Sequence, residues 1–146
     1  MAAVVAVVVA ADQITKSWAV DRLADGNVDV FWTLRFNLGL NSGMAFSQGE
    51  GLTRYITVVG VLLVAGLTWW SRNVTSPRLA VAIALLIGGA MGNLADRFFR
   101  PGGAVVDFID LQWWPVFNVA DIAIALGAML LLVTTWREPA TPAAAP

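Results

Sequence analysis

The chain has 146 residues, of which 58% are hydrophobic and only 13% charged, and its mean hydropathy is +0.72. A soluble domain would carry about twice that charged fraction, so the composition predicts a single-domain integral membrane protein, and the net charge of -1 predicts no nucleic-acid partner. The chain has no His and no Cys, which excludes a disulfide framework, a Ser–His triad, a Cys nucleophile and an imidazole or thiolate zinc site.

Four apolar segments can cross a bilayer as helices once their flanking residues are included, since a spanning helix needs about 20 residues. They cover residues 1–20, 55–70, 79–97 and 116–136. The sequence therefore predicts an all-α membrane protein with four transmembrane helices in one domain, residues 1–137. The Pro/Ala-rich tail, residues 138–146, is predicted to be disordered.

The longest polar stretch, about residues 21–53, separates the first and second spans. Its segment VDVFWTLRF, residues 28–36, alternates apolar and polar positions, which predicts a short strand. The Gly- and Asn-rich NLGLNSG that follows, residues 37–43, predicts a turn. We therefore expect a small β-containing unit between the first two helices.

Charged residues in the loops predict the orientation of the chain. The short loop SRNVTSPR carries Arg72 and Arg78 and no acid, and Arg137 follows the fourth span. The long polar stretch is acidic on balance. Because short basic loops remain in the cytoplasm, both termini are predicted to be cytoplasmic and the long stretch extracytoplasmic.

With this orientation, the polar residues within the spans gather at the outer face. They are Asp12, Lys16, Asn93, Asp96, Arg97, Asn118 and Asp121, and Asp107 lies in the connection before the fourth span. Ionisable residues in membrane segments face the bundle interior and mark function more often than not. The pattern predicts a site near the outer leaflet.

Two of these pairs leave alternatives open. Asp12 and Lys16 share a helix face at i,i+4; they are either a self-neutralising pair or a lysine positioned to contact a substrate carbonyl or to orient its neighbours. Arg97 is expected to pair with Asp96 and to reach toward the interface. The preceding segment GGAMGN, residues 88–93, has small residues at a spacing that lets helices approach closely.

Asn118 and Asp121 begin the fourth span at i,i+3, which is close to a capping box with an Asn N-cap. Asp107 enters from the apolar run VVDF. If the two aspartates meet in a partly dry place, they cannot both ionise cheaply, so one keeps a proton. The pair could then supply a base and an acid together, as in aspartic proteases.

Five motifs occur in the order found in the lipoprotein signal peptidases, also called signal peptidase II. They are DQITK (12–16), NSGMAFS (41–47), GAMGNLADR (89–97), VVDFID (105–110) and FNVAD (117–121). The chain resembles this family from about residue 12 to residue 127. Five ordered motifs in a four-span protein form a highly specific pattern.

The resemblance implies an aspartic endopeptidase of the bacterial inner membrane. Such an enzyme removes signal peptides from diacylglyceryl-modified prolipoproteins, cuts before the lipidated cysteine, contacts membrane lipids, and works as a monomer without a cofactor or metal. Asp107 and Asp121 correspond to the catalytic pair. The resemblance also implies a strand-rich extracytoplasmic cradle over about residues 21–53 and a short covering segment near residues 98–104. The positions that match the surroundings of the site are Asp12, Lys16, Asn41, Gly43, Gly89, Asn93, Arg97, Asn118 and Ala120.

The alternative is a small proton-coupled transporter or channel, with a relay through Asp12, Lys16, Asp96 and Asp121. A relay must continue to the inner face, and the one-sided placement of the polar groups argues against it. A purely structural subunit would leave the paired carboxylates without a purpose.

Four aromatic residues are suited to the membrane interface: Phe46, Phe98, Trp113 and Trp114. They could line a lipid entry. For the two tryptophans, an aromatic belt is the favoured interpretation.

Overall fold

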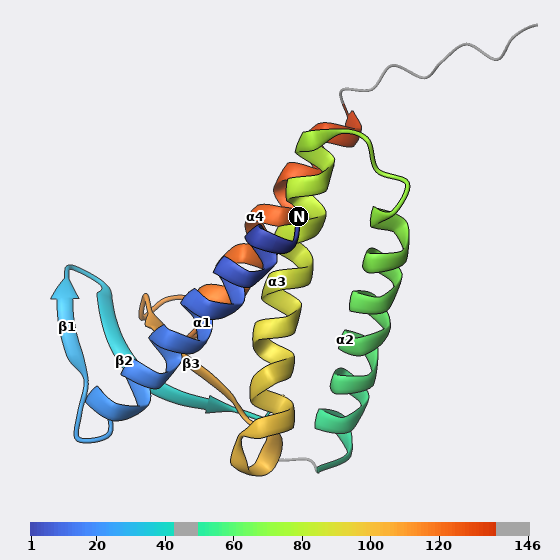
Figure 1. Cartoon of the computed structure of the whole chain (residues 1–146). Coiled ribbons are helices and arrows are strands. Elements are labelled where there is room, and N and C mark those ends of the chain that lie inside the picture. The colour runs from blue at the N-terminus through green and yellow to red at the C-terminus, as the bar shows by residue number, and fades with distance from the viewer. Residues whose placement is uncertain (43–49, 137–146) are drawn as a thin grey trace, which may run out of the picture.

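The computed structural model describes residues 1–42 and 50–136. Its four long helices are α1 (Ala2–Arg22), α2 (Glu50–Ser71), α3 (Pro77–Phe99) and α4 (Val119–Trp136). All four are long and apolar enough to cross a membrane (Figure 1), which confirms the prediction of four spans. Gly43, Phe46 and the predicted disordered tail lie outside the described residues.

Three strands form one antiparallel sheet in the order β1-β2-β3. They are β1 (Val28–Phe31), β2 (Leu34–Asn41) and β3 (Val105–Asp110). The single strand predicted over residues 28–36 is in fact a hairpin that turns at Trp32 and Thr33. The turn predicted from residue 37 is wrong as far as Asn41, because pairing with β3 holds this Gly- and Asn-rich stretch extended.

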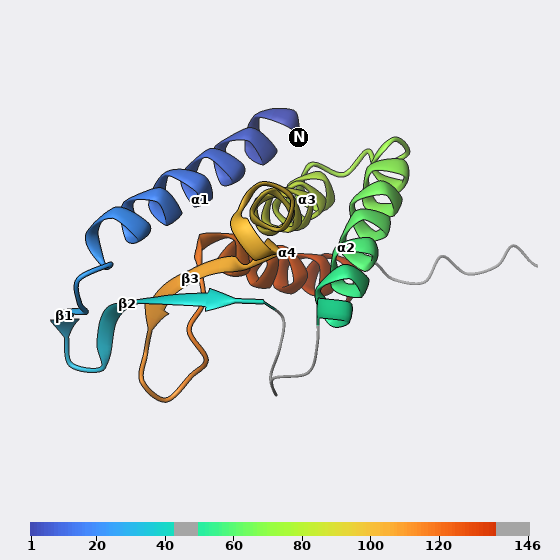
Figure 2. The ribbon, with the colours of Figure 1, turned by 90° about the horizontal axis from the view of Figure 1, so that it is seen from below.

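The cradle is larger than the sequence predicted, because its third strand comes from the connection between α3 and α4. Seen from below, β2 and β3 run side by side across the end of the bundle (Figure 2). Gly39 on β2 lies opposite Asp107 on β3. Asp107 is therefore held in a paired strand, where its backbone direction is fixed, and not in a free connection.

An apolar cluster joins the cradle to the helices. Ala19 and Leu23 of α1 pack against Val106 and Phe108 of β3, and all four are buried. Trp18 adds an edge contact to Phe108, with ring centroids 6.2 Å apart. Aromatic pairs in this arrangement stabilise beyond their buried area. The cluster holds β3 against the C-terminal half of α1.

α3 is the central helix and packs against the other three (Figure 1). Ser76 caps its start and Pro77 occupies its first turn. A Cβ added to Gly88 would lie 2.9 Å from Val8 of α1, and one added to Gly92 would lie 2.6 Å from the Asp12 carboxylate. Gly89 lies directly against the Ala120 carbonyl of α4. The expectation that these glycines permit close packing is confirmed.

This packing predicts opposite effects for the same substitution on two helices. Gly88→Ala is expected to lower the thermal unfolding temperature in detergent, because the new methyl group meets Val8 and overpacking costs about 1–3 kcal/mol. Gly66→Ala in α2 is the matched control, since nothing lies within 4 Å of its added Cβ and alanine favours the helix by roughly 0.5–1 kcal/mol. Equal unfolding temperatures for the two variants would contradict the interpretation.

Candidate active site

Asn118 and Asp121 form a reciprocal capping box at the start of α4. The backbone N–H of Asp121 donates to Asn118 Oδ1 (3.0 Å), and the backbone N–H of Asn118 donates to Asp121 Oδ2 (3.1 Å). The sequence prediction of this cap is confirmed. The cap places the Asp121 carboxylate at a helix N-terminus, where the helix dipole favours negative charge.

The same Asn118 also reaches the second carboxylate, and so bridges the two aspartates. Its Nδ2 donates to Asp107 Oδ1 at 2.6 Å. The other oxygen of Asp107 accepts from Nδ2 of Asn41 on β2 (2.9 Å), and Asp121 Oδ1 accepts from Nδ2 of Asn93 on α3 (2.8 Å). Three asparagine amides from three elements thus fix the two carboxyl groups beside each other.

The surroundings of Asp107 favour its protonated form. Burial raises the pKa of Asp107 above its ordinary value, and the neighbouring charge of Asp121 acts in the same direction. The hydrogen bonds from Asn41 and Asn118 lower this pKa but do not outweigh burial. The residue is 4% exposed. The geometry therefore places a carboxyl that favours its protonated form beside a second carboxyl at the N-terminus of α4.

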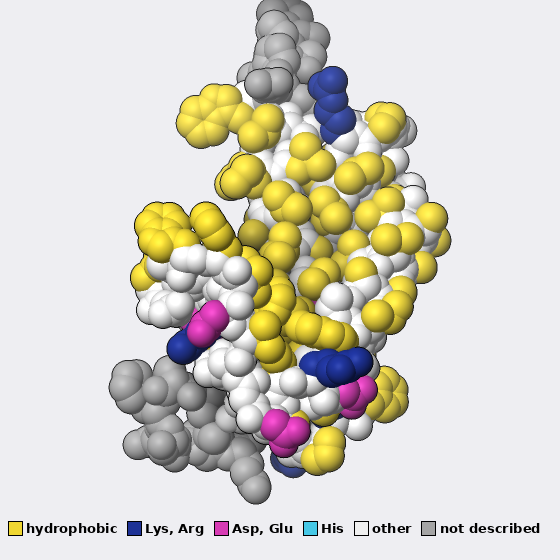
Figure 3. All heavy atoms as spheres, turned by 90° about the vertical axis from the view of Figure 1, so that its left-hand side faces the viewer, with side chains coloured by type: hydrophobic (Ala, Val, Ile, Leu, Met, Phe, Trp, Pro, Cys, Tyr) yellow, Lys and Arg dark blue, Asp and Glu magenta, His cyan; other side chains and the backbone are white. Residues whose placement is uncertain are grey.

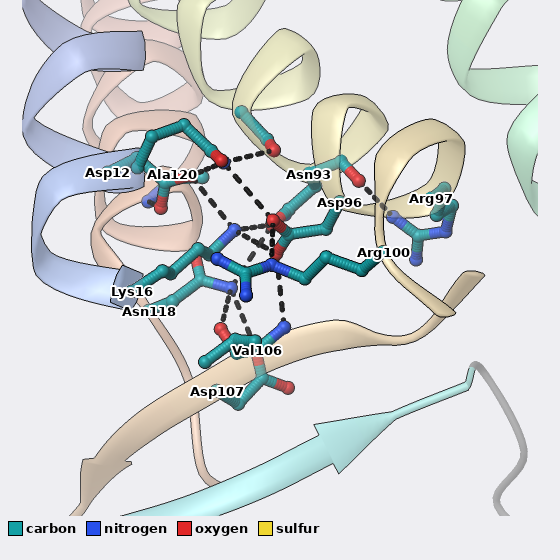
Figure 4. A network of polar contacts seen from close by, with 12 residues as sticks. Asp12, Lys16, Asn93, Asp96, Arg97, Arg100, Val106, Asp107, Asn118 and Ala120 are labelled. Atoms are coloured by element: carbon teal, nitrogen blue, oxygen red, sulfur yellow. Dashed lines mark hydrogen bonds and ion pairs between the residues drawn. The ribbon is translucent and has the colours of Figure 1, made fainter. Parts of the chain in front are cut away.

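Lys16 lies behind this pair and is fully buried. Its Nζ is 2.8 Å from Asp12 Oδ2, 2.9 Å from Asp96 Oδ2 and 2.9 Å from Asn93 Oδ1 (Figure 4). An ammonium group has three donors, and these three oxygens use them. Of the alternatives for Lys16, a self-neutralising pair and orientation of its neighbours both hold, whereas a contact with a substrate carbonyl does not fit.

The two acidic partners of Lys16 each anchor another segment. Oδ1 of Asp12 accepts the backbone N–H of Ala120 at 2.9 Å, which ties α1 to the start of α4. Oδ2 of Asp96 accepts the backbone N–H of Val106 at 3.0 Å, one residue before Asp107 (Figure 4). These buried carboxylates therefore act through the backbone to place the segments that carry the aspartate pair.

The expected pair of Asp96 and Arg97 is wrong. Asp96 pairs with Arg100, whose Nε lies 2.8 Å from Asp96 Oδ1, because residues at i,i+4 share a helix face and adjacent residues do not. Arg97 instead donates to the Asn93 carbonyl at 3.2 Å, and its charge interacts with Asp107 and Asp121. The charges of Arg97 and Lys16 thus both act on the aspartate pair, Arg97 on both members and Lys16 on Asp107.

Two members of the network were missed in the sequence. Arg100 could have been found from its spacing to Asp96. Gln13 offered no signal beyond its place beside Asp12; its Nε2 donates to Asp12 Oδ2 (3.2 Å), to Asp96 Oδ1 (3.2 Å) and to the Gly92 carbonyl (3.1 Å). Among the described residues, every buried side-chain nitrogen or oxygen has a hydrogen-bond partner.

Asp110, at the far end of β3, belongs to a separate contact. Its Oδ2 accepts from Arg35 Nε on β2 at 2.6 Å, and this hydrogen bond, together with the backbone N–H of Gln112, lowers the pKa of Asp110. It therefore holds the register of the sheet and takes no part in the paired carboxylates.

Two apolar grooves approach the site from the membrane. One, of about 650 Å³, lies between α2 and α3 and is lined by Val58, Leu62 and Arg97. The other, of about 560 Å³, runs along α4 from Trp114 and includes Asp121. Each groove includes one charged residue of the site, Arg97 in the first and Asp121 in the second.

The profile of the family described as signal peptidase (SPase) II matches residues 4–137. This chain belongs to the signal peptidase II family. It is 47% identical over 136 residues to the lipoprotein signal peptidase of Mycobacterium avium (strain 104), covering 89% of this chain and 75% of the relative. The lipoprotein signal peptidase of Mycobacterium tuberculosis (strain ATCC 25618 / H37Rv) is 45% identical, covering 89% and 67%.

Solved structures agree with the family assignment. A bacterial membrane enzyme determined by the in meso method superposes with a TM-score of 0.82 at 26% identity, covering 98% of this chain and 91% of that one. A second such structure, at 24% identity and a TM-score of 0.81, shares the fold. This signal peptidase II is a peptidase hydrolase and a multi-pass protein of the bacterial inner membrane, and the transporter alternative is not favoured.

Proposed function

We propose that the protein cleaves diacylglyceryl-modified prolipoproteins before the lipidated cysteine, with Asp107 and Asp121 as an aspartic catalytic pair. The observation that carries the proposal is the Asn118 bridge, which holds both carboxyl groups at one place. The names of the similar mycobacterial proteins support the substrate class.

The reaction is a direct addition of water to the scissile carbonyl. The ionised member of the pair removes a proton from the water, and a C–O bond forms. The protonated member donates a hydrogen bond to the carbonyl oxygen and stabilises the tetrahedral intermediate. The C–N bond then breaks, the departing amine of the lipidated cysteine receives a proton from the pair, and the signal peptide leaves with a new carboxyl group. The pair ends with the one shared proton with which it began.

The surroundings favour Asp107 as the member that holds the proton. Burial raises its pKa, while Asp121 accepts from two N–H donors at a helix N-terminus. We infer that Arg97, whose charge acts on both carboxyls, compensates the single negative charge that remains and binds the substrate backbone.

The other family-matched residues support this pair. Asn41, Asn93 and Asn118 orient the carboxyl groups, and Asp12 and Lys16 hold the segments around them. Gly89 and Ala120 contribute close backbone packing and one N–H. Gly43 is proposed as a site position by resemblance alone.

Lipid anchoring explains a site within the membrane. Each buried CH₂ contributes about 0.8 kcal/mol, so two acyl chains keep the substrate in the bilayer. We infer that both termini are cytoplasmic, that the site lies near the outer leaflet, and that one chain suffices for activity. The two apolar grooves are paths by which such a substrate could enter laterally.

The test is cleavage of a synthetic lipobox peptide by the full-length protein in detergent. The peptide carries a diacylglyceryl-cysteine, and an otherwise identical peptide with an unmodified cysteine is the matched control. Mass spectrometry is expected to find a new amino terminus at the lipidated cysteine, and little product from the control. Cleavage at another bond, or equal cleavage of both peptides, would contradict the proposal. No cleavage by folded protein would favour the transporter alternative, which predicts proton or solute flux across reconstituted vesicles.

A further inference from the structure

The β1–β2 hairpin ends in large apolar side chains that nothing in the described part of the chain covers. Phe31 is 78% exposed and Trp32 is 89% exposed, and Val30 before them is half exposed. Turns are ordinarily rich in Gly, Pro, Asn, Asp and Ser. A turn made instead from aromatic residues indicates contact with an apolar or interfacial medium.

The turn points toward the membrane-spanning part of the molecule. β1 leaves the end of α1 and runs back beside it, so that the β1–β2 turn lies nearer the N-terminal end of α1 than the α1–β1 connection does (Figure 1). The aromatic tip therefore lies on the bilayer side of the cradle, and the charged connection that contains Asp25 lies on the opposite side.

A second aromatic turn lies beside the first. Gln112 Nε2 donates to the carbonyl of Thr33 at 3.1 Å, which joins the β3–α4 loop to the hairpin turn. The next two residues, Trp113 and Trp114, are 70% and 58% exposed, and their ring centroids are 6.1 Å apart. Four exposed aromatic side chains thus come from two turns that are hydrogen-bonded to each other.

This aromatic surface continues onto the lipid-facing side of the bundle. Trp113 and Trp114 line the groove that runs along α4 past Ile122 and Leu126. On the face drawn in Figure 3, hydrophobic side chains extend from the helices onto the upper part of the cradle, and the acidic side chains gather toward the lower end. Because the aromatic surface is continuous with the side of α4 that faces lipid, this continuity indicates that the membrane also contacts the aromatic surface.

We propose that Phe31 and Trp32, together with Trp113 and Trp114, form an interfacial anchor that inserts into the headgroup region of the outer leaflet. The proposal rests on the orientation given under the proposed function. The three tryptophan rings, each with an N–H at one edge, are suited to this depth, and Phe31 adds apolar area. Because the anchor belongs to the sheet that carries Asp107, it fixes the height of the catalytic strand relative to the lipid surface.

The natural absence of cysteine allows a direct measurement of depth. Trp32→Cys and Phe31→Cys variants of the full-length protein carry one nitroxide label each in phosphatidylethanolamine/phosphatidylglycerol vesicles. Asp25→Cys, in the exposed α1–β1 connection, is the matched control. The ratio of collisions with oxygen to collisions with a water-soluble nickel chelate is expected to be several-fold higher at residues 31 and 32 than at residue 25.

Equal ratios at the three positions would overturn the anchor. A label shielded from both reagents would overturn it as well, because a second copy or another protein would then cover the tip. The depth measurement does not depend on peptide cleavage, so it stands apart from the proposed catalytic function.

Activity gives a second readout. A Phe31→Ser, Trp32→Ser double variant is expected to lose turnover several-fold on substrate embedded in vesicles and to keep it in detergent, where no leaflet must be matched. Unchanged turnover in vesicles would contradict the anchor.

Discussion

Asp107→Asn and Asp121→Asn are each expected to abolish cleavage of the lipidated peptide while the protein stays folded. Asparagine keeps the shape of the side chain and an oxygen that can accept the hydrogen bond from Asn118 or Asn93. It can neither take a proton from water nor return one to the amine. Each proton transfer contributes roughly 10²–10⁴-fold to the rate, so kcat should fall by at least that factor with little change in KM.

Whereas Asp107→Asn is expected to lose activity, its stability against unfolding is expected to increase. Since burial raises the pKa of Asp107, ionisation of this residue costs the folded state free energy. That cost is absent at low pH, where the carboxyl is protonated in both states, and appears as pH rises through its ordinary unfolded value of about 3.9. The variant is therefore expected to unfold at a higher temperature than wild type at pH 7, and at a similar temperature at pH 3.

Asp110→Asn on the same strand is the matched control. Arg35 lowers the pKa of Asp110, so its ionised form stabilises the folded state above the ordinary pKa, and that stability is lost as pH falls through the lowered value. The control should cleave the peptide normally and unfold at a lower temperature at pH 7. Near-normal turnover in either Asp107→Asn or Asp121→Asn would refute the catalytic pair.

The parts of the fold that could be predicted are those that local sequence determines. A bilayer requires a continuous apolar helix, so four spans are visible in composition alone. The extent of strand β2 could not be predicted in this way, because its residues 37–41 favour a turn when taken alone. They become a strand through pairing with β3, about 65 residues further along the chain, and no local pattern contains that information.

The contacts of the candidate site divide in the same way, into local contacts that the sequence predicts and long-range contacts that it does not. The capping box of Asn118 and Asp121 is a contact at i,i+3, and the sequence predicted it correctly. The bridge from Asn118 to Asp107 requires β3 to run beneath the start of α4, and the three partners of Lys16 require α1 to lie against α3. The predicted partner of Asp96 was the adjacent Arg97, whereas its observed partner, Arg100, lies one helical turn later on the same face. The family resemblance indicated which residues belong to the site, but not which of them contact each other.

Lys16→Met is expected to be the most destabilising single change among these variants. The substitution keeps the length of the side chain but removes the cation that bridges Asp12 and Asp96, both fully buried, and leaves Asp96 with Arg100. Breaking a buried ion pair costs about 3–5 kcal/mol, because the remaining charge is left uncompensated.

Thermal or denaturant unfolding in detergent measures this loss, and Arg35→Met is the matched control. That substitution removes the same kind of charge from a pair in which the arginine is 33% exposed, where exposed ion pairs are worth about 0–1 kcal/mol. Similar unfolding temperatures for the two variants would show that the buried network does not hold α1 against α3. A Lys16→Met protein that remained folded at low temperature is still expected to lose turnover, because Asn93 Oδ1 would keep only one of its two donors, Asn118 Nδ2, and the amide that donates to Asp121 would be held less firmly. The aspartate pair is therefore expected to depend on the buried charge of Lys16, whose three donors are all used within the protein.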